Sequence, residues 1–174
     1  YLEIEGVLEG YEVIDPHSYS DFDEMVASLV ERRNGKMTEE EARQVLTEDV
    51  NYFGVMLVHM GIVDGMVSGA IHSTAATVRP ALQIIKTRPN VKRTSGAFLM
   101  VRGTERYLFG DCAININPDA EGLAEIAINS AITAKMFGID PKIAMLSYST
   151  KGSGFGESVD KVVEATKLAH ELRP

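Results

Sequence analysis

Apolar side chains recur at three- and four-residue spacing near the start of the chain, which is typical of a helix that buries one face. The residues that share this spacing are Phe22, Met25, Val26, Leu29 and Val30. Asn34-Gly35 predicts the end of this helix, because both residues tolerate the left-handed backbone conformation. Thr38 precedes three glutamates, a capping-box pattern that predicts the start of a second helix. The mostly apolar residues 50–60 predict a third helix, which ends at Gly61.

Two short apolar runs, residues 62–68 and 142–148, lead into turns rich in glycine and hydroxyl groups. Each run has the length and composition of a buried strand. Residues 94–101 and 106–114 are rich in strand-forming residues and predict a hairpin. Strand, loop and helix follow one another repeatedly, so the sequence predicts an α/β architecture with a largely parallel sheet.

Three further helix starts can be located from local signals. Proline is best tolerated in the first turn, so a helix is predicted to begin at Pro80, with Arg79 near its N-cap. Asp119 is placed to cap a helix that Gly138 ends, and Ser158 opens a last helix.

Composition and charge narrow the function classes. The chain has 174 residues, 45% of them hydrophobic, and 25 acidic against 17 basic side chains, for a net charge of −8. This balance argues against a nucleic-acid or membrane-surface binder. One cysteine cannot form an internal disulfide, and no apolar run approaches the roughly 20 residues of a membrane span, so a cytoplasmic location is expected.

The turn between residues 69 and 80 combines hydroxyl groups with a cation. Ser73, Thr74 and Thr77 lie close to the predicted helix start, and Arg79 adds a guanidinium. Helix N–H groups, hydroxyls and arginine together favour a phosphate site. The alternative is a capped helix whose arginine pairs with a surface acid.

The second polar turn offers Ser147, Ser149, Thr150 and Lys151. The lysine precedes the glycines, so the order differs from that of a nucleotide-binding loop, and a flexible loop is the alternative to a binding role. Cys112 lies in a predicted strand with no paired histidine, which favours an inert buried thiol over a nucleophile. No spacing of His, Cys and carboxylate residues indicates a metal site.

Several long motifs occur in an order that resembles the phosphate acetyltransferase family over essentially the whole chain. The residues that carry the resemblance are 64–74, 78–87, 110–115, 123–127 and 144–153. The resemblance implies reversible acetyl transfer between acetyl phosphate and coenzyme A in acetate metabolism, by thiolate attack on the acyl phosphate. It implies a cytoplasmic homodimer whose substrates are acetyl phosphate, coenzyme A, acetyl-CoA and inorganic phosphate, with no metal in the chemical step.

The same resemblance implies a fold of two three-layer α/β/α lobes, with largely parallel sheets and an active-site cleft between them, as in isocitrate and isopropylmalate dehydrogenases. Residues 1–89 then belong to the first lobe and residues 90–174 to the second. The family's N-terminal and C-terminal portions, including a late Asp-Leu-Ser-Arg-Gly motif and the aspartate that takes the thiol proton, are absent from this chain. Ala76 departs from the acidic or amide residue of many relatives.

Residue roles carry over where the motifs match. Arg32 and Arg79 correspond to catalytic arginines that hold phosphate or carbonyl oxygen. The substrate-binding positions implied by the resemblance are Ser68, Gly69, Ser73, Thr74, Thr77, Ser147, Ser149, Thr150, Lys151 and Gly152. Cys112 corresponds to a cysteine near the site whose role is expected to be non-essential.

Three alternatives compete with an acetyltransferase. A phosphate butyryltransferase would differ in the size of its acyl pocket. The regulatory domain fused to some malic enzymes resembles this family but senses acetyl-CoA without turnover, and the intact Ser73-Thr74 pair with Arg79 favours an enzyme over such a sensor. A dehydrogenase would need metal-binding aspartates and a nucleotide loop, which the sequence lacks.

Overall fold

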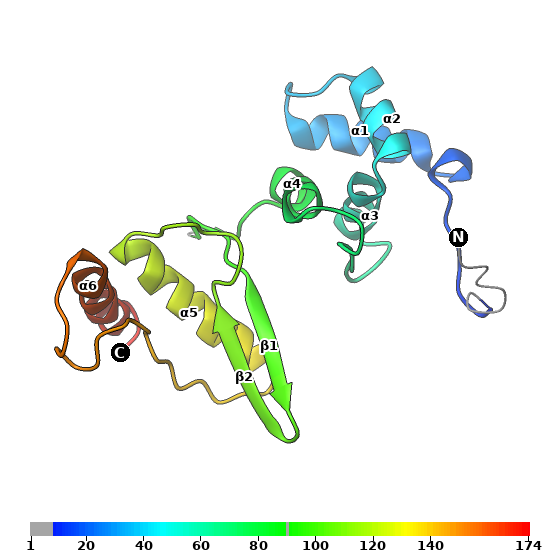
Figure 1. Cartoon of the computed structure of the whole chain (residues 1–174). Helices are drawn as coiled ribbons and strands as arrows, with labels where there is room; N and C mark the ends of the chain where they lie inside the picture. The colour runs from blue at the N-terminus through cyan, green and yellow to red at the C-terminus, as the bar shows by residue number, and fades with distance from the viewer. Residues whose placement is uncertain (1–8, 90) are drawn as a thin grey trace. The chain divides into compact units, whose positions relative to one another are not determined.

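The computed structural model describes residues 9–89 and 91–174. The chain packs as two compact units, Tyr1–Lys86 and Thr87–Pro174, each described by itself below (Figure 1). The start of the acidic N-terminal segment, residues 1–8, lies outside the described residues, as does Asn90 at the predicted lobe boundary.

The first unit is helical. Its elements are the 3-10 turn η1 (Pro16–Ser18) and the helices α1 (Phe22–Arg33), α2 (Glu39–Glu48), α3 (Val50–His59) and α4 (Thr74–Ile84). The first three predicted helices are confirmed. Asn34 ends α1 in the left-handed conformation, with φ of 48°. The capping box at Thr38 is formed in both directions, because Thr38 N–H donates to Glu41 Oε2 at 2.7 Å and Glu41 N–H donates to Thr38 Oγ1 at 3.2 Å.

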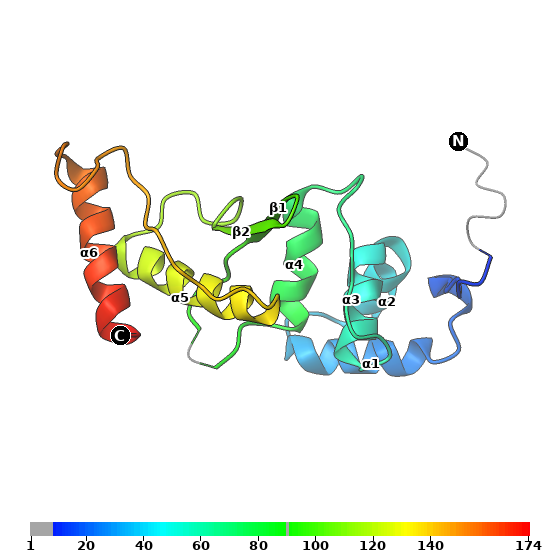
Figure 2. The ribbon, with the colours of Figure 1, turned by 90° about the horizontal axis from the view of Figure 1, so that it is seen from below.

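One hydrophobic core holds these helices together. α3 contacts α2 and α4, and α1 contacts the same two helices (Figure 2). Tyr19 meets Phe53 edge to face, with ring centroids 5.5 Å apart. The buried hydrophobic residues are Met25, Val26, Leu29, Ala42, Leu46, Tyr52, Phe53, Val55, Met56, Leu57 and Ile84. The spacing that predicted α1 is therefore the spacing of its buried face.

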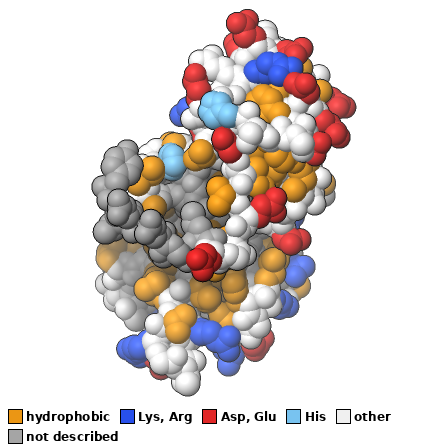
Figure 3. Space-filling view, turned by 90° about the vertical axis from the view of Figure 1, so that its right-hand side faces the viewer, with side chains coloured by type: hydrophobic (Ala, Val, Ile, Leu, Met, Phe, Trp, Pro, Cys, Tyr) orange, Lys and Arg blue, Asp and Glu red, His pale blue; other side chains and the backbone are white. Residues whose placement is uncertain are grey.

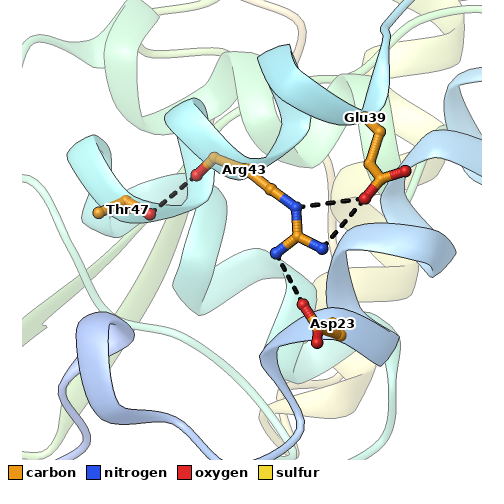
Figure 4. Close-up of polar contacts among 4 residues, drawn as sticks. All are labelled: Asp23, Glu39, Arg43 and Thr47. Atoms are coloured by element: carbon orange, nitrogen blue, oxygen red, sulfur yellow. Dashed lines mark hydrogen bonds and ion pairs between the residues drawn. The ribbon is translucent and has the colours of Figure 1, made fainter.

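A surface ion-pair group joins the outer sides of α1 and α2 (Figure 4). Arg43 on α2 contacts Asp23 on α1 at 2.6 Å and Glu39 at 3.0 Å. Thr47 Oγ1 donates to the carbonyl of Arg43 at 2.8 Å. The two carboxylates are largely exposed and Arg43 is partly so, so water screens the attraction.

The fourth helix differs from its prediction. α4 begins at Thr74, and Pro80 lies buried inside it, so a start at Pro80 is wrong. A proline there leaves the carbonyl of Ala76 without its helical donor. The Ser73 cap and the burial of Pro80 and Ile84 offset that loss.

The second unit contains the only strands among the described residues. β1 (Ala97–Arg102) pairs with β2 (Glu105–Gly110) as an antiparallel hairpin, with Phe98 opposite Phe109. The predicted hairpin is confirmed. The chain thus combines helices with one small sheet.

Two helices pack with this hairpin. α5 (Ala120–Met136) contacts β2, and α6 (Glu157–Leu172) contacts α5 (Figure 1). Asp119 caps α5 as predicted, accepting from Gly122 N–H at 2.8 Å. α6 begins one residue before Ser158, at Glu157, with Val159 buried.

The strands predicted at residues 62–68 and 142–148 are absent from the structure, which also shows no parallel pairing within residues 9–89 and 91–174. Val67 is fully exposed and Leu146 is 84% exposed, so neither run is the buried strand expected. A strand exists only where a neighbour accepts and donates its backbone hydrogen bonds, and neither run has one here.

Large hydrophobic side chains reach the surface in both units, among them Val67 and Phe155, and Figure 3 shows such side chains in orange on one face. The hairpin is an example, because Phe98 and Phe109 are each more than half exposed. An antiparallel pair packed on one side by a single helix leaves its other face open.

Candidate functional site

The start of α4 presents the predicted hydroxyl cluster. Ser73 is the N-cap, and its Oγ accepts from Ala76 N–H at 3.2 Å. Thr77 Oγ1 donates to the carbonyl of Ser73 at 3.1 Å. The hydroxyls of Ser73 and Thr77 therefore shape the helix end, while the exposed Thr74 occupies its first position. The first N–H groups of a helix have no acceptor within it and attract an anion.

Arg79 lies in the second turn of α4, and its side chain is exposed. At helical spacing it shares a face with Ala75 and Ala76, roughly a third of the way round the helix from Ser73. The expectation of an N-cap position for Arg79 is therefore wrong. Arg79 still lies within the first two turns of α4, as the hydroxyl cluster does.

Arg32 is the second predicted arginine, and it lies in the last turn of α1. Its guanidinium donates from Nε to the carbonyl of Ile84 and from Nη2 to the carbonyl of Ile85, the latter at 3.0 Å. These carbonyls end α4, where a cation is favoured by the helix dipole. Arg32 thus joins α1 to the helix that carries Arg79.

Tyr52 and Gln83 form a polar pair near the charge of Arg33, which sequence reasoning missed. Tyr52 is 8% exposed, and its hydroxyl donates to Gln83 Oε1 at 2.7 Å. Burial raises the pKa of Tyr52, and the positive charges of Arg33 and Arg79 partly counter that rise. Both guanidinium groups therefore act on one buried hydroxyl. The sequence did not predict this role for Tyr52, because residues 50–60 are mostly apolar and indicate only a buried helix.

Arg33 has a further unusual feature. Its Nε is buried and has no hydrogen-bond partner among the described residues. An unsatisfied donor costs free energy unless another group accepts from it. The double arginine at residues 32 and 33 was the only sequence signal that could have pointed to it.

Ser68 and Gly69 precede α4. Ser68 is exposed, and its Oγ donates to Oδ1 of the buried Asn51 on α3. Gly69 has φ of 123°, a conformation that other residues rarely adopt, and its carbonyl accepts from His72 N–H at 3.1 Å. These contacts hold the segment that leads into Ser73.

The second predicted binding turn, residues 147–152, is closed by its own hydrogen bonds. Ser147 Oγ donates to the carbonyl of Ser149 at 3.1 Å, and Thr150 N–H donates to Ser153 Oγ at 2.9 Å. Lys151 and Gly152 both have positive φ, of 48° and 85°. The turn is therefore compact, with the exposed Lys151 at its tip.

An open cavity of about 810 Å³ lies between β2, α5 and residues 139–146 of the second unit. Cys112 is on its wall, half-buried, with Sγ donating to the carbonyl of Phe109 at 2.8 Å. It follows β2 rather than lying within a strand, so the expected buried strand position is wrong.

Asp111 fixes the backbone next to that cysteine. Its carboxylate accepts from Gly96 N–H at 3.0 Å, from Asn115 N–H at 2.7 Å and from Asn115 Nδ2 at 2.6 Å. Burial raises the pKa of Asp111, but these hydrogen bonds, led by the one from the Asn115 side chain, outweigh it and hold the pKa below its usual range. The carboxylate therefore ties the start of β1 to the turn after β2.

The sequence of this chain matches that of a known protein family. Residues 2–174 match the family described as Phosphate acetyl/butaryl transferase. The chain is 58% identical over 172 residues to the phosphate acetyltransferase of Bacillus subtilis (strain 168), covering 99% of this chain and 53% of the relative. This chain belongs to the phosphate acetyl/butaryl transferase family. The resemblance seen in its motifs is confirmed.

Other members of the family are also similar to this chain. The phosphate acetyltransferase of Staphylococcus epidermidis (strain ATCC 12228) is 61% identical over 160 residues, 92% of this chain and 48% of that relative. A solved phosphotransacetylase from Streptococcus pyogenes is 66% identical with a TM-score of 0.82, over 91% of this chain and 49% of that one. The EutD phosphotransacetylase from Staphylococcus aureus is 58% identical with a TM-score of 0.84, over 95% of this chain and 50% of that one. The chain spans about half the length of the family members it matches.

Two negative findings apply to the described part of this family member. Within it, no three His, Cys, Asp or Glu side chains are grouped as metal ligands. None of its helices has the length and apolar character needed to cross a membrane.

Proposed function

We propose that the full-length protein transfers an acetyl group reversibly between acetyl phosphate and coenzyme A. In the forward step the coenzyme A thiolate attacks the acetyl carbonyl, a carbon–sulfur bond forms, the carbon–oxygen bond to phosphate breaks, and inorganic phosphate leaves. The observation that carries this proposal is the 58% identity to a phosphate acetyltransferase over 99% of the chain. The named relatives do not favour the butyryl and regulatory alternatives.

The start of α4 is the proposed site for the phosphoryl end of the substrate. The backbone N–H groups of Thr74 and Ala75 have no acceptor inside the helix, and the Thr74 hydroxyl is exposed beside them. Arg79 supplies a positive charge on the same helix. Fixed N–H groups and a guanidinium stabilise both the bound phosphate and the negative charge that develops during attack.

Residues 147–152 are proposed to bind substrate in the second unit. The exposed ammonium of Lys151 stands at the tip of a turn that is already ordered by its own hydrogen bonds. A preformed turn loses little conformational entropy when an anionic ligand binds. Coenzyme A enters as a co-substrate, and the chemical step is proposed to need no metal.

The finer architecture is also a proposal. We expect two three-layer α/β/α lobes with largely parallel sheets in the full-length protein, with residues 1–89 in one lobe and 90–174 in the other. The exposure of Val67 and Leu146 supports this, because both lie in strand-forming runs that gain free energy when buried. The family resemblance also supports a cytoplasmic location and a homodimer. Light scattering of the purified protein tests whether it is a dimer.

The decisive experiment measures acetyl-CoA formation from acetyl phosphate and coenzyme A with the full-length protein. Butyryl phosphate in parallel reactions reports the acyl preference, and the isolated 174-residue polypeptide shows whether this part suffices. A folded full-length protein that forms no acetyl-CoA, but binds it, would replace the enzyme by the regulatory alternative.

A further inference from the structure

The segment between α3 and α4 runs back along one side of α3, as Figure 2 shows. Its first contact is at the end of the helix, where the N–H groups of Ile62 and Val63 both donate to the carbonyl of Leu57, at 3.0 and 3.5 Å. Two more contacts follow, at Gly54 and Asn51. Residues 57, 54 and 51 are three apart and so lie near one another on the helix surface.

Gly54 sets the closest approach along this line. A Cβ atom placed on Gly54 would lie 2.6 Å from Met66 Sδ and 3.4 Å from Met66 Cγ. Met66 is half-buried and packs against the core of the first unit, so a shift of its side chain to admit a Cβ would disturb that packing. Glycine is a poor helix former, so its place in the middle of α3 needs a packing reason. The contact with Met66 supplies one.

Asn51 holds the far end of the segment. It is 2% exposed, and its Oδ1 accepts the hydrogen bond from Ser68 Oγ. The partner residue, Ser68, is exposed, so without this bond its hydroxyl would be free to turn into solvent. A buried acceptor therefore holds the last residue before the Gly69 turn.

Only four residues separate Ser68 from Ser73, the cap of α4. Gly69 makes the turn with φ of 123°, and His72 N–H donates back to its carbonyl. Displacement of Met66 or Ser68 is therefore passed through a short, closed turn to Ser73 and Thr74.

We infer that Gly54 and Asn51 are positioning residues for the acyl-phosphate site: by fixing Met66 and Ser68 they set where Ser73 and Thr74 stand. This inference rests on the proposed function. Neither residue is proposed to touch the substrate, and both act through the 66–69 segment.

The test is Gly54→Ala in the full-length protein, with Gly65→Ala as the matched control. An added Cβ at Gly65 meets nothing within 4 Å, whereas at Gly54 it meets Met66. Because small misplacements of a reacting group can cost up to about 100-fold in rate, we expect kcat/KM for acetyl phosphate to fall at least about tenfold in Gly54→Ala. Gly65→Ala should stay within about twofold of the wild type.

Three readouts separate positioning from general damage. The KM for acetyl phosphate should rise in Gly54→Ala while the KM for coenzyme A stays unchanged, and Asn51→Ala should show the same split. Alanine favours a helix more than glycine does, so Gly54→Ala is expected to fold. Adding Met66→Ala to Gly54→Ala removes the clashing sulfur and should restore the KM in part, giving a measurable coupling between the two positions.

Amide hydrogen exchange over residues 66–72 tests the contact independently of activity. Faster exchange there in Gly54→Ala, with an altered KM for acetyl phosphate, is the expected result. Unchanged exchange, or faster exchange with an unaltered KM, overturns the inference. If the wild type shows no acetyl transfer, the proposed function fails instead, and the positioning inference falls with it even where exchange changes.

Discussion

Arg32 on α1 donates a hydrogen bond from Nη2 to the carbonyl of Ile85, 3.0 Å away, at the C-terminal end of α4. Its Nε donates to the carbonyl of Ile84 in the same turn. The guanidinium therefore satisfies two carbonyls that the helix leaves without donors, and it places a positive charge at the negative end of the helix dipole.

Removal of this side chain is expected to reduce stability. Hydrogen bonds to a charged group contribute about 1.5–3 kcal/mol, so Arg32→Ala should lower the free energy of unfolding by about that amount in urea titrations. Arg32→Lys keeps the charge but cannot donate to both carbonyls with the planar geometry of arginine. Its free energy of unfolding should lie between those of the wild type and Arg32→Ala. An unchanged unfolding free energy in Arg32→Ala would show that the helix end is satisfied in another way.

Arg43→Ala serves as a comparison for Arg32→Ala, because it removes an arginine that makes only surface ion pairs. Its ion pairs with Asp23 and Glu39 are short, but the two carboxylates are largely exposed and Arg43 is partly exposed (Figure 4). Exposed pairs contribute about 0–1 kcal/mol, so Arg43→Ala should change the unfolding free energy by less than about 1 kcal/mol. The effect should shrink further in high salt. A loss as large as that of Arg32→Ala would mean that the pair is a structural anchor.

Arg79 is expected to differ from Arg32 in its effect on stability. It is exposed on α4, so Arg79→Ala should leave the unfolding free energy within about 0.5 kcal/mol of the wild type. Acetyl transfer should fall by about 100-fold or more, because the cation proposed for the phosphate site is lost. Kinetics of the full-length protein with phosphate as product inhibitor check both turnover and phosphate binding. Near-normal values for both would remove Arg79 from the site.

Cys112 is expected to be dispensable. Its thiol already donates to the carbonyl of Phe109, and no histidine in the described part of the chain is hydrogen-bonded to it. Cys112→Ala should therefore retain acetyl transfer within about threefold, since a nucleophile's loss would cost far more. A much larger loss of turnover, with an unaltered melting temperature, would make the thiol part of the chemistry.

Asp111 predicts a pH dependence of the second unit. Burial raises its pKa, but the hydrogen bonds from Asn115, Gly96 and Ile114 dominate and lower it overall. A carboxylate with a lowered pKa stabilises the fold fully above its unfolded pKa, and the contribution is lost as pH falls through the folded pKa. The stability gap between the wild type and Asp111→Asn should thus be largest at neutral pH and narrow in strong acid. Urea titrations from neutral to strongly acidic pH measure this difference. A difference that does not change with pH would contradict a stabilising role for the ionised Asp111 carboxylate.

Local signals alone determined most of the helices and their ends. Thr38 with Glu41, Asn34 and Asp119 act within one turn of the backbone, so their effects can be read from neighbours in sequence. The hairpin was predictable for the same reason, because its two strands are joined by a short turn. Family membership was also readable, since long motifs persist in order along the chain.

Tertiary structure decided what those signals could not. Residues 62–68 have the composition of a strand, but their partners are Leu57, Gly54 and Asn51 of α3, and so they run along a helix instead. Pro80 lies inside α4 because burial and the Ser73 cap outweigh one lost hydrogen bond. Arg32 reaches Ile84 and Ile85 across 52 and 53 residues of sequence. Such contacts form between residues that are far apart in the sequence and that packing brings together. The pattern of neighbouring residues therefore cannot predict them.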